Sequence, residues 1–123
     1  MQKTTYSVTP GGWAQANKVA GATQFLFISG QVPVGADGVV PEDITEQSHL
    51  VWANLKAQLA AADMTLENVV KLTIFLTDQG YGKAMAAVRN QHFGPNIQPA
   101  VTTVIAGLFD PRWKIEIEAI AAA

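Results

Sequence analysis

The sequence predicts a single α/β domain in which short strands are combined with two helices. The first observation is the length, since 123 residues lie within the usual size of one domain. The second is the order of local patterns: three short strands, a helix, a strand, a second helix and two final strands. The third is the lack of a linker, repeat or low-complexity segment before the terminal alanines. Residues 1–123 are therefore expected to form one unit.

The first part of the chain predicts three strands. Residues 4–8 are rich in β-formers, and a Pro-Gly-Gly cluster at residues 10–12 ends this strand. Residues 17–20 and 24–29 are typical of a hairpin whose turn lies near Gly21. The second of these strands is apolar on both faces, so we expect it to be covered on both sides.

The two helices have the clearest local signals. Asp43 and Glu46 form a D-x-x-E capping pattern at the start of the first helix. Apolar side chains then recur every three or four residues from Ile44 to Ala62, as on one face of an amphipathic helix. The second helix is expected from about residue 82 to residue 93, where a Gly-Pro pair stops it.

The remaining strands lie between and after the helices. Residues 65–68 predict a single capped turn, which leads into a strand over residues 69–76 with alternate apolar side chains on one face. Two further strands are expected over residues 100–105 and 114–121.

The composition indicates an oligomer. Hydrophobic residues make up 49% of the chain and charged residues only 15%. A chain of this size has a high surface-to-volume ratio, so this much apolar side chain is hard to bury inside one subunit. Surplus apolar surface usually lies in a subunit interface.

Charge and residue types argue against several functions. The formal net charge is -2 and the 8 basic residues are scattered, so no concentrated positive surface supports nucleic-acid binding. The lack of cysteine excludes disulfides, thiolate catalysis and thiolate metal sites. His49 and His92 have no partner at ligand spacing, so we expect no metal site and interpret both as structural.

The sequence also gives an expectation of where in the cell the protein is found. The first residues lack the apolar core of a signal peptide, and no apolar run approaches the roughly 20 residues that span a bilayer. We therefore expect a cytoplasmic protein that has no membrane partner.

Five segments together resemble the reactive-intermediate-deaminase family (Rid, also called YjgF or L-PSP). The first holds the sequence S-G-Q-V-P at residues 29–33, which matches the family's S-G-Q-x-P. The five occur in the family's order, at residues 27–33, 54–56, 69–78, 98–100 and 114–121.

The resemblance implies a chorismate-mutase-like fold, a mixed sheet with two helices packed on one face. It also implies a homotrimer whose sheets form a central barrel, with a small-molecule cleft between each pair of subunits. The implied activity is hydrolysis of reactive enamines and imines, such as 2-aminoacrylate, to ketones and ammonia, with neither cofactor nor metal.

The resemblance also assigns site residues. Glu116 matches the acid that orients or activates water, and Thr103 stands where active members have cysteine. Val101 stands where the deaminating members have an arginine that binds the substrate carboxylate, and the family's helix asparagine falls near Ala86. A charge-assisted hydrogen bond of this kind contributes roughly 1.5 to 3 kcal/mol. Val101 should therefore discriminate against small 2-imino acids.

For Glu116 the strand pattern alone offers a plainer interpretation. Glu116 and Glu118 share one face of the last strand, about 6.6 Å apart. They alternate with Ile115 and Ile117, as on any strand with a polar outer face. The resemblance favours the functional interpretation for Glu116 and leaves Glu118 as surface.

Further residues are candidates for ligand binding. Trp13 is either an apolar wall over a ligand or an anchor at the trimer interface. Ser29 and Gly30 present a hydroxyl and a closely approaching backbone at a strand end, although the hydroxyl can equally cap its own loop. Arg112 is a candidate replacement cation for the missing arginine, and a surface salt bridge is the alternative. Arg89, on the second helix, is expected to be solvated.

Two functions follow from this sequence. The first is hydrolytic deamination of an enamine or imine other than a simple 2-imino acid, with Glu116 activating water and Thr103 assisting. The second is a non-catalytic trimer that binds or senses a small metabolite in clefts between its subunits.

Overall fold

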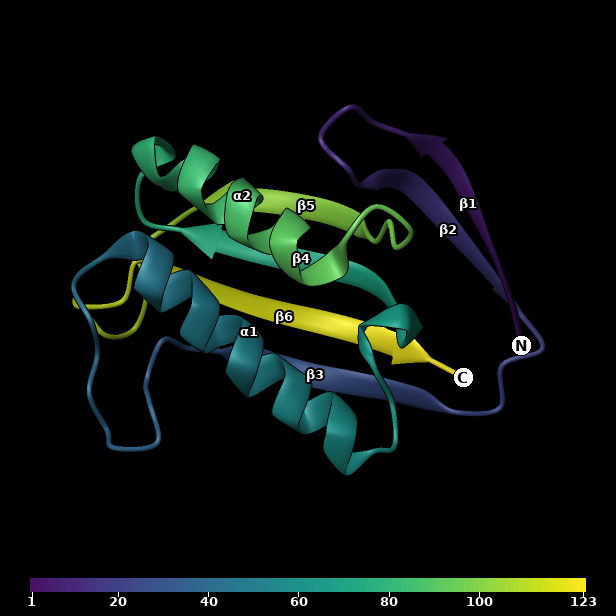
Figure 1. The fold of residues 1–123 in the computed structure, drawn as a ribbon, viewed down its shortest axis with the longest axis horizontal. Helices are drawn as coiled ribbons and strands as arrows, with labels where there is room; N and C mark the ends of the chain where they lie inside the picture. The colour runs from purple at the N-terminus through teal and green to yellow at the C-terminus, as the bar shows by residue number, and fades with distance from the viewer.

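The computed structural model describes residues 1–123 as six strands, two α-helices and two short 3-10 turns (Figure 1). In chain order these are β1 (Gln2–Val8), β2 (Ala14–Ala20), β3 (Phe25–Gln31), α1 (Ile44–Ala61), η1 (Leu66–Asn68), β4 (Val69–Leu76), η2 (Gln79–Tyr81), α2 (Gly82–Phe93), β5 (Ala100–Ile105) and β6 (Ile115–Ala122). Neither helix is long and apolar enough to cross a membrane.

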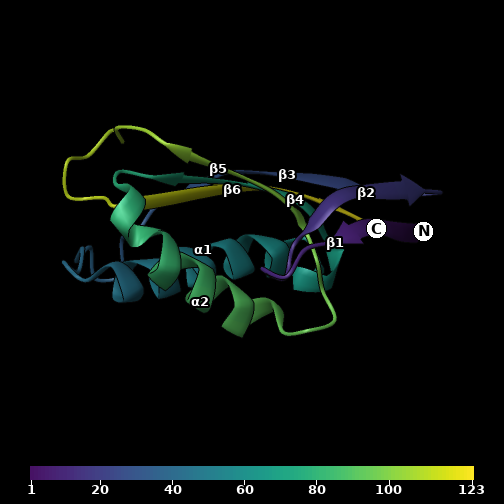
Figure 2. The same ribbon diagram turned by 90° about the horizontal axis from the view of Figure 1, so that it is seen from above.

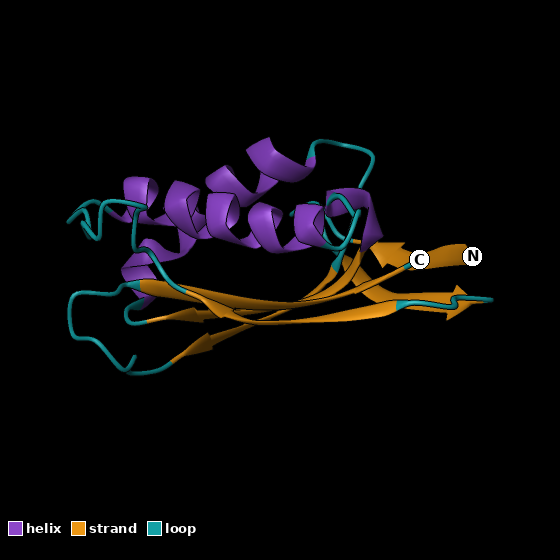
Figure 3. Cartoon of the chain, turned by 90° about the horizontal axis from the view of Figure 1, so that it is seen from below, coloured by secondary structure: helices purple, strands orange, loops and turns teal.

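The strands form one mixed sheet in the order β1-β2-β5-β4-β6-β3. β5 runs parallel to both β2 and β4, and the other neighbours are antiparallel. Both helices lie on one face of the sheet and leave the other face without a helix (Figures 2 and 3). The predicted fold class, a mixed sheet with two helices on one face, is confirmed.

The predicted hairpin between the second and third strands is wrong. β2 pairs with β1, whereas β3 lies at the opposite edge of the sheet and pairs with β6. The chain leaves β2 at Gly21, whose φ of 70° lies in the left-handed region that favours glycine. Two amides beyond it, those of Thr23 and Gln24, donate to the carbonyl of Ala123. Contacts with the far end of the chain, rather than a local turn, therefore set the position of β3.

The core lies between the sheet and the helices. Its fully buried side chains come from α1, β4 and β6: Val51, Trp52, Leu55, Leu59, Leu72, Ile74, Leu76, Ile115 and Ile117. The opposite face of the sheet is open in the single chain, where Phe25 is 58% and Phe27 75% exposed. The expectation that β3 is covered on both sides is therefore not met within one chain.

Both predicted helix ends are confirmed. The Asp43 carboxylate accepts a hydrogen bond from the backbone N–H of Glu46 at 3.0 Å, which caps the start of α1. α2 ends at Phe93, where Gly94 adopts a φ of 68°. These local signals were sufficient because capping depends on residues three or four positions apart.

Gln47, a buried side chain of α1, joins three segments. Its amide donates to the carbonyls of Pro41 at 2.7 Å and Arg112 at 2.9 Å, and its oxygen accepts from the N–H of Lys114 at 2.8 Å. All of its polar atoms are thus satisfied in a site with no exposed surface. The first turn of α1 therefore holds the start of β6, the strand that carries Glu116.

The β1–β2 hairpin is joined to the rest of the sheet by few contacts. One residue pair, Ala14 with Ala100, makes up the ladder between β2 and β5. The Asn17 side chain adds hydrogen bonds to the carbonyls of Val70 at 3.0 Å and Gln98 at 3.1 Å. Beyond Ala100 the outer edge of β5 pairs with no strand of this chain.

Candidate functional site

Glu116 and Gly30 meet where the start of β6 lies beside the end of β3. A β-bulge lies between Ile28 and Gln31, so Gly30 falls in an irregular part of the ladder. A Cβ atom at Gly30 would overlap the Glu116 carboxylate and would lie 2.8 Å from its Cδ. Only glycine leaves room for the carboxylate over this strand. The neighbouring Ser29 is exposed, and its carbonyl accepts a hydrogen bond from Gln31 at 3.0 Å.

The Glu116 carboxylate is half-buried on the face of the sheet that has no helices. It pairs across the sheet with Phe75 of β4, and no side chain or backbone group of the chain forms a hydrogen bond or ion pair with it. Burial raises the pKa of Glu116, and the negative charge of Glu118 on the same face raises it further. An unpaired carboxylate of raised pKa can accept a proton from a bound water.

We refer to Trp13, Val101 and Thr103 as a second group, because Trp13 lies beside the start of β5 and the other two residues lie on that strand. The N–H of Ala14 donates to the carbonyl of Pro99 at 2.9 Å, which places Trp13 next to this strand. Val101 is half-buried and packs against the core, whereas Thr103 is exposed.

The two groups do not meet within one chain. Thr103 pairs with Ile74 of β4, and Ile74 also pairs with Ile117 of β6. Glu116 is the neighbour of Ile117, so its side chain points to the opposite face of the sheet. β4 also separates the two strands. Glu116 and Thr103 could share a ligand only if two chains each contributed one of them.

Arg112 lies outside both groups. It sits in the loop between β5 and β6 and forms a bidentate contact with Asp110, the closer N···O distance being 2.8 Å. Its side chain is 65% exposed. Within the chain, the salt bridge weighed as the alternative to a ligand-binding role is present and uses Asp110 rather than Glu116.

Arg89 is a correction to the sequence analysis, because it is buried and not solvated. It is 5% exposed, and its guanidinium donates to the carbonyl of Gly11 at 2.9 Å. The Asn90 amide donates to the same carbonyl at 3.2 Å. Burial lowers the pKa of Arg89. Together these two side chains of α2 hold the loop that leads to Trp13.

The histidines form a pair that no sequence spacing indicates. His49 Nδ1 and His92 Nε2 lie 3.0 Å apart across the two helices, and His92 stacks on Trp52. Burial lowers the pKa of His92 to about 4, with smaller effects from the charges of Lys56 and His49. No three or more His, Asp or Glu side chains are placed to hold a metal ion.

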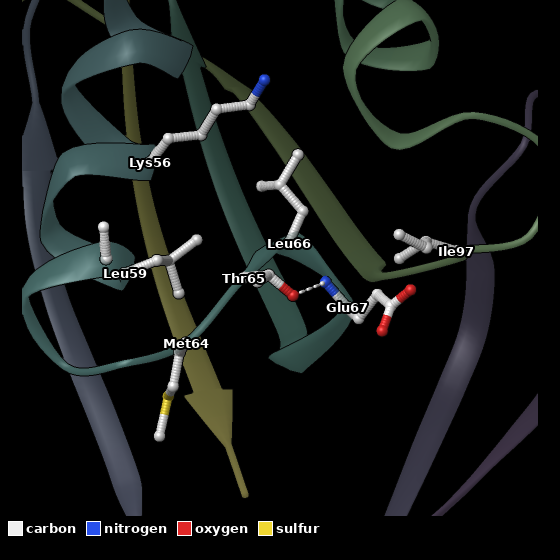
Figure 4. Close-up of a pocket in the computed structure, with 8 residues that line it drawn as sticks. Lys56, Leu59, Met64, Thr65, Leu66, Glu67 and Ile97 are labelled. Carbon is white, nitrogen blue, oxygen red and sulfur yellow. Dashed lines mark hydrogen bonds between the residues drawn. The ribbon is translucent and has the colours of Figure 1, made fainter.

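The largest cavity lies on the helix side of the sheet, away from both groups. It has a volume of about 540 Å³ and lies between the C-terminal half of α1, η1 and the loop before β5 (Figure 4). Its lining is mostly apolar, and Lys56 and Glu67 supply its charged groups.

The mixed sheet with two helices on one face, together with the Glu116–Gly30 contact, defines a small α/β domain with one candidate catalytic carboxylate. The chain belongs to the Rid/YjgF/L-PSP family, since residues 7–123 match the family described as Endoribonuclease L-PSP. It is 38% identical to a RutC family protein of Pyrococcus horikoshii over 113 residues, which cover 90% of this chain and 86% of the relative. It is 43% identical to the mitochondrial protein mmf2 of Schizosaccharomyces pombe over 115 residues, 91% of this chain and 88% of mmf2.

Solved structures agree with this assignment. The Rid protein YyfB of Yersinia pestis, whose function is unknown, superimposes with a TM-score of 0.79 at 29% identity and full coverage of both chains. TdcF of Escherichia coli with bound serine superimposes with a TM-score of 0.77 at 30% identity, covering 97% of this chain and 92% of TdcF. The YjgF-type, chorismate-mutase-like fold is therefore established.

Proposed function

We propose that this protein hydrolyses a small enamine or imine metabolite, releasing ammonia. The observation that supports this most directly is the unpaired, half-buried Glu116 carboxylate, whose pKa is raised and which lies against the one residue type that leaves it room, Gly30. TdcF of Escherichia coli, 33% identical over 99 residues, is provisionally named a reactive intermediate deaminase. No cofactor enters the proposed reaction.

The reaction needs one proton acceptor and one water. Glu116 takes a proton from the water as its oxygen bonds to the carbon of the C=N group. The proton then passes to the nitrogen, which gives a carbinolamine; an enamine enters this step as its imine tautomer. Glu116 next transfers the proton of the carbinolamine hydroxyl to the nitrogen, the C=O bond forms as the C–N bond breaks, and a ketone and ammonia leave. Because burial and the charge of Glu118 raise the pKa of Glu116, its carboxylate is a stronger base than that of an ordinary glutamate.

The substrate we propose is not a simple 2-imino acid. The position that would carry a carboxylate-binding arginine holds Val101, which packs against the core and offers no charge. Arg112, the candidate replacement, is held by Asp110 at 2.8 Å. An uncharged or aromatic imine suits the apolar pair of Val101 and Trp13 better than a carboxylate does.

The complete site in this proposal needs two chains of a homotrimer. Glu116, Gly30 and Ser29 lie in one group, and Trp13, Val101 and Thr103 lie in the other. The face of the sheet without helices exposes Phe25 and Phe27, and the loop after β5 exposes Phe109 almost fully. Apolar surface of this kind favours association between chains. Sedimentation of the purified protein at several concentrations tests the trimer.

The test of the chemistry is Glu116→Gln. Imines are generated from a panel of neutral, aromatic and acidic amino acids by an amino-acid oxidase, and ammonia release is followed with and without the protein. We expect acceleration that falls by at least about 100-fold in the variant, the range that general-base removal typically produces. Glu118→Gln, on the same face but exposed, is the matched control. Equal activity in all three proteins would exclude Glu116 from the mechanism.

A non-catalytic binding protein is the second candidate. It is favoured by the absence of any hydrogen-bond partner that would orient the Glu116 carboxylate, and by the uncharged Val101. Mass spectrometry of the purified protein distinguishes the two. An intact metabolite retained at one per chain or per cleft, together with no turnover of any imine, would favour binding without chemistry.

A further inference from the structure

We infer that the cavity beside η1 is a second binding site, which takes a small amphipathic carboxylate. This site lies on the helix side of the sheet, whereas Glu116 faces the opposite side. The inference therefore stands or falls independently of the proposed hydrolysis.

The cavity has an apolar floor. Leu59 and Ala60 come from the last turns of α1, Leu66 from η1, and Ile97 from the loop before β5. Its volume of about 540 Å³ lies in the range of small-molecule sites. Figure 4 shows Lys56 extending from α1 on one side of Leu66, with Glu67 and Ile97 on the other side.

The walls of the cavity are fixed before any ligand binds. Thr65 and Asn68 form a reciprocal capping box around η1, in which the Thr65 hydroxyl accepts from the N–H of Glu67 at 3.3 Å. The Asn68 amide donates to the carbonyl of Ala122 at 3.1 Å, which anchors the turn to the sheet. Little binding free energy is therefore lost to reorganisation of the site when a ligand binds.

Charge selects the class of ligand. The Lys56 ammonium has no hydrogen bond or ion pair within the chain, since Arg112 and Asp110 form the one ion pair present. Glu67, in contrast, lies near Lys3, whose ammonium donates to the Glu67 carbonyl at 3.1 Å and interacts with its carboxylate charge. The rim of the cavity therefore carries one uncompensated positive charge above an apolar surface. A carboxylate attached to a short aliphatic chain or a single ring complements both the positive charge of Lys56 and the apolar surface below it.

The test compares sodium hexanoate with 1-hexanol, which has the same chain length but no charge. Binding is followed from backbone amide shifts in NMR spectra of the full chain. We expect shifts centred on residues 59–67 and Ile97, with hexanoate binding about three- to tenfold more tightly than hexanol. Lys56→Met should reduce hexanoate binding to that of hexanol, whereas Lys83→Met, an exposed lysine of α2 outside the cavity, should change nothing.

Ala60→Trp supplies the steric control. Ala60 is exposed on α1 and its replacement fills the cavity without disturbing the core, so both probes should be excluded. The inference is overturned if neither probe binds, if hexanol binds as tightly as hexanoate, or if Ala60→Trp leaves the shifts unchanged. It is also overturned if Ala60→Trp changes the oligomeric state, because a second copy of the chain would then be the occupant.

Discussion

The stability of this protein should fall between neutral and mildly acidic pH because of His92. The imidazole has a pKa of about 4 in the folded chain, whereas the ordinary pKa of a histidine is 6.5. The unfolded chain therefore binds a proton more readily between these values. The stability that neutral His92 contributes is fully present above pH 6.5 and is lost as the pH falls towards 4.

The size of this effect follows from the two pKa values. Their difference corresponds to at most about 3.4 kcal/mol. The ring of His92 is only half-buried, so water screens part of this free energy. We expect the unfolding free energy to fall by about 1 to 2 kcal/mol between pH 7.5 and pH 4.5. The groups around the ring are Trp52 and His49 of α1, which contact it, and the charge of Lys56.

The measurement is urea unfolding of the native protein and of His92→Gln at both pH values, at one fixed protein concentration. Subtracting the two pH dependences removes the contribution of the carboxylates, which titrate in both proteins. His49→Gln should retain most of the native pH dependence, because burial is the largest cause of the lowered pKa. If His92→Gln lost as much stability on acidification as the native protein, the assignment to His92 would be refuted.

Two further predictions concern the surroundings of Glu116. Gly30→Ala should displace the Glu116 carboxylate, because the new Cβ would lie 2.8 Å from the Cδ of Glu116. The NMR titration of the Glu116 carboxyl carbon should therefore change. An unaltered titration would contradict the close contact. Gln47→Met, of similar volume, should cost roughly 2 to 4 kcal/mol of unfolding free energy because it breaks three hydrogen bonds and leaves buried partners unsatisfied. The same change at the exposed Gln58 of α1 should cost less than about 0.5 kcal/mol, and equal costs in chemical denaturation would argue against a joining role for Gln47.

Those parts of the fold that depend on near neighbours in sequence could be predicted. Asp43 with Glu46, and the Gly-Pro pair after Phe93, mark helix ends through contacts a few residues long. The position of β3 could not be predicted in this way, because its paired residues in β6 lie 86 to 97 positions further along the chain. The glycine after β2 marks a change of direction and does not specify which strand the chain meets next.

Some features of the candidate site could also be predicted from the sequence, and others could not. Glu116 was identified by resemblance, and the structure adds the neighbour that explains Gly30, a contact between positions far apart in sequence. Burial of Arg89 was missed because its partner, the Gly11 carbonyl, is a backbone group with no residue signature. The His49–His92 pair joins two helices, and no residue near either histidine in the sequence predicts this contact.

The single residue pair between β2 and β5 gives the sheet a modular construction. The four strands from β5 to β3 are held by ladders of five to seven residue pairs, whereas one pair, Ala14 with Ala100, joins the β1–β2 hairpin to them. Side-chain hydrogen bonds of Asn17, Arg89 and Asn90 complete the attachment of the hairpin. A change in the length of the hairpin would therefore disturb only one residue pair of the central strands. Trp13 lies in the loop of this hairpin, and Glu116 lies on β6, one of the strands with a long ladder. Substitutions in the hairpin can therefore move Trp13 without changing the ladder that positions Glu116.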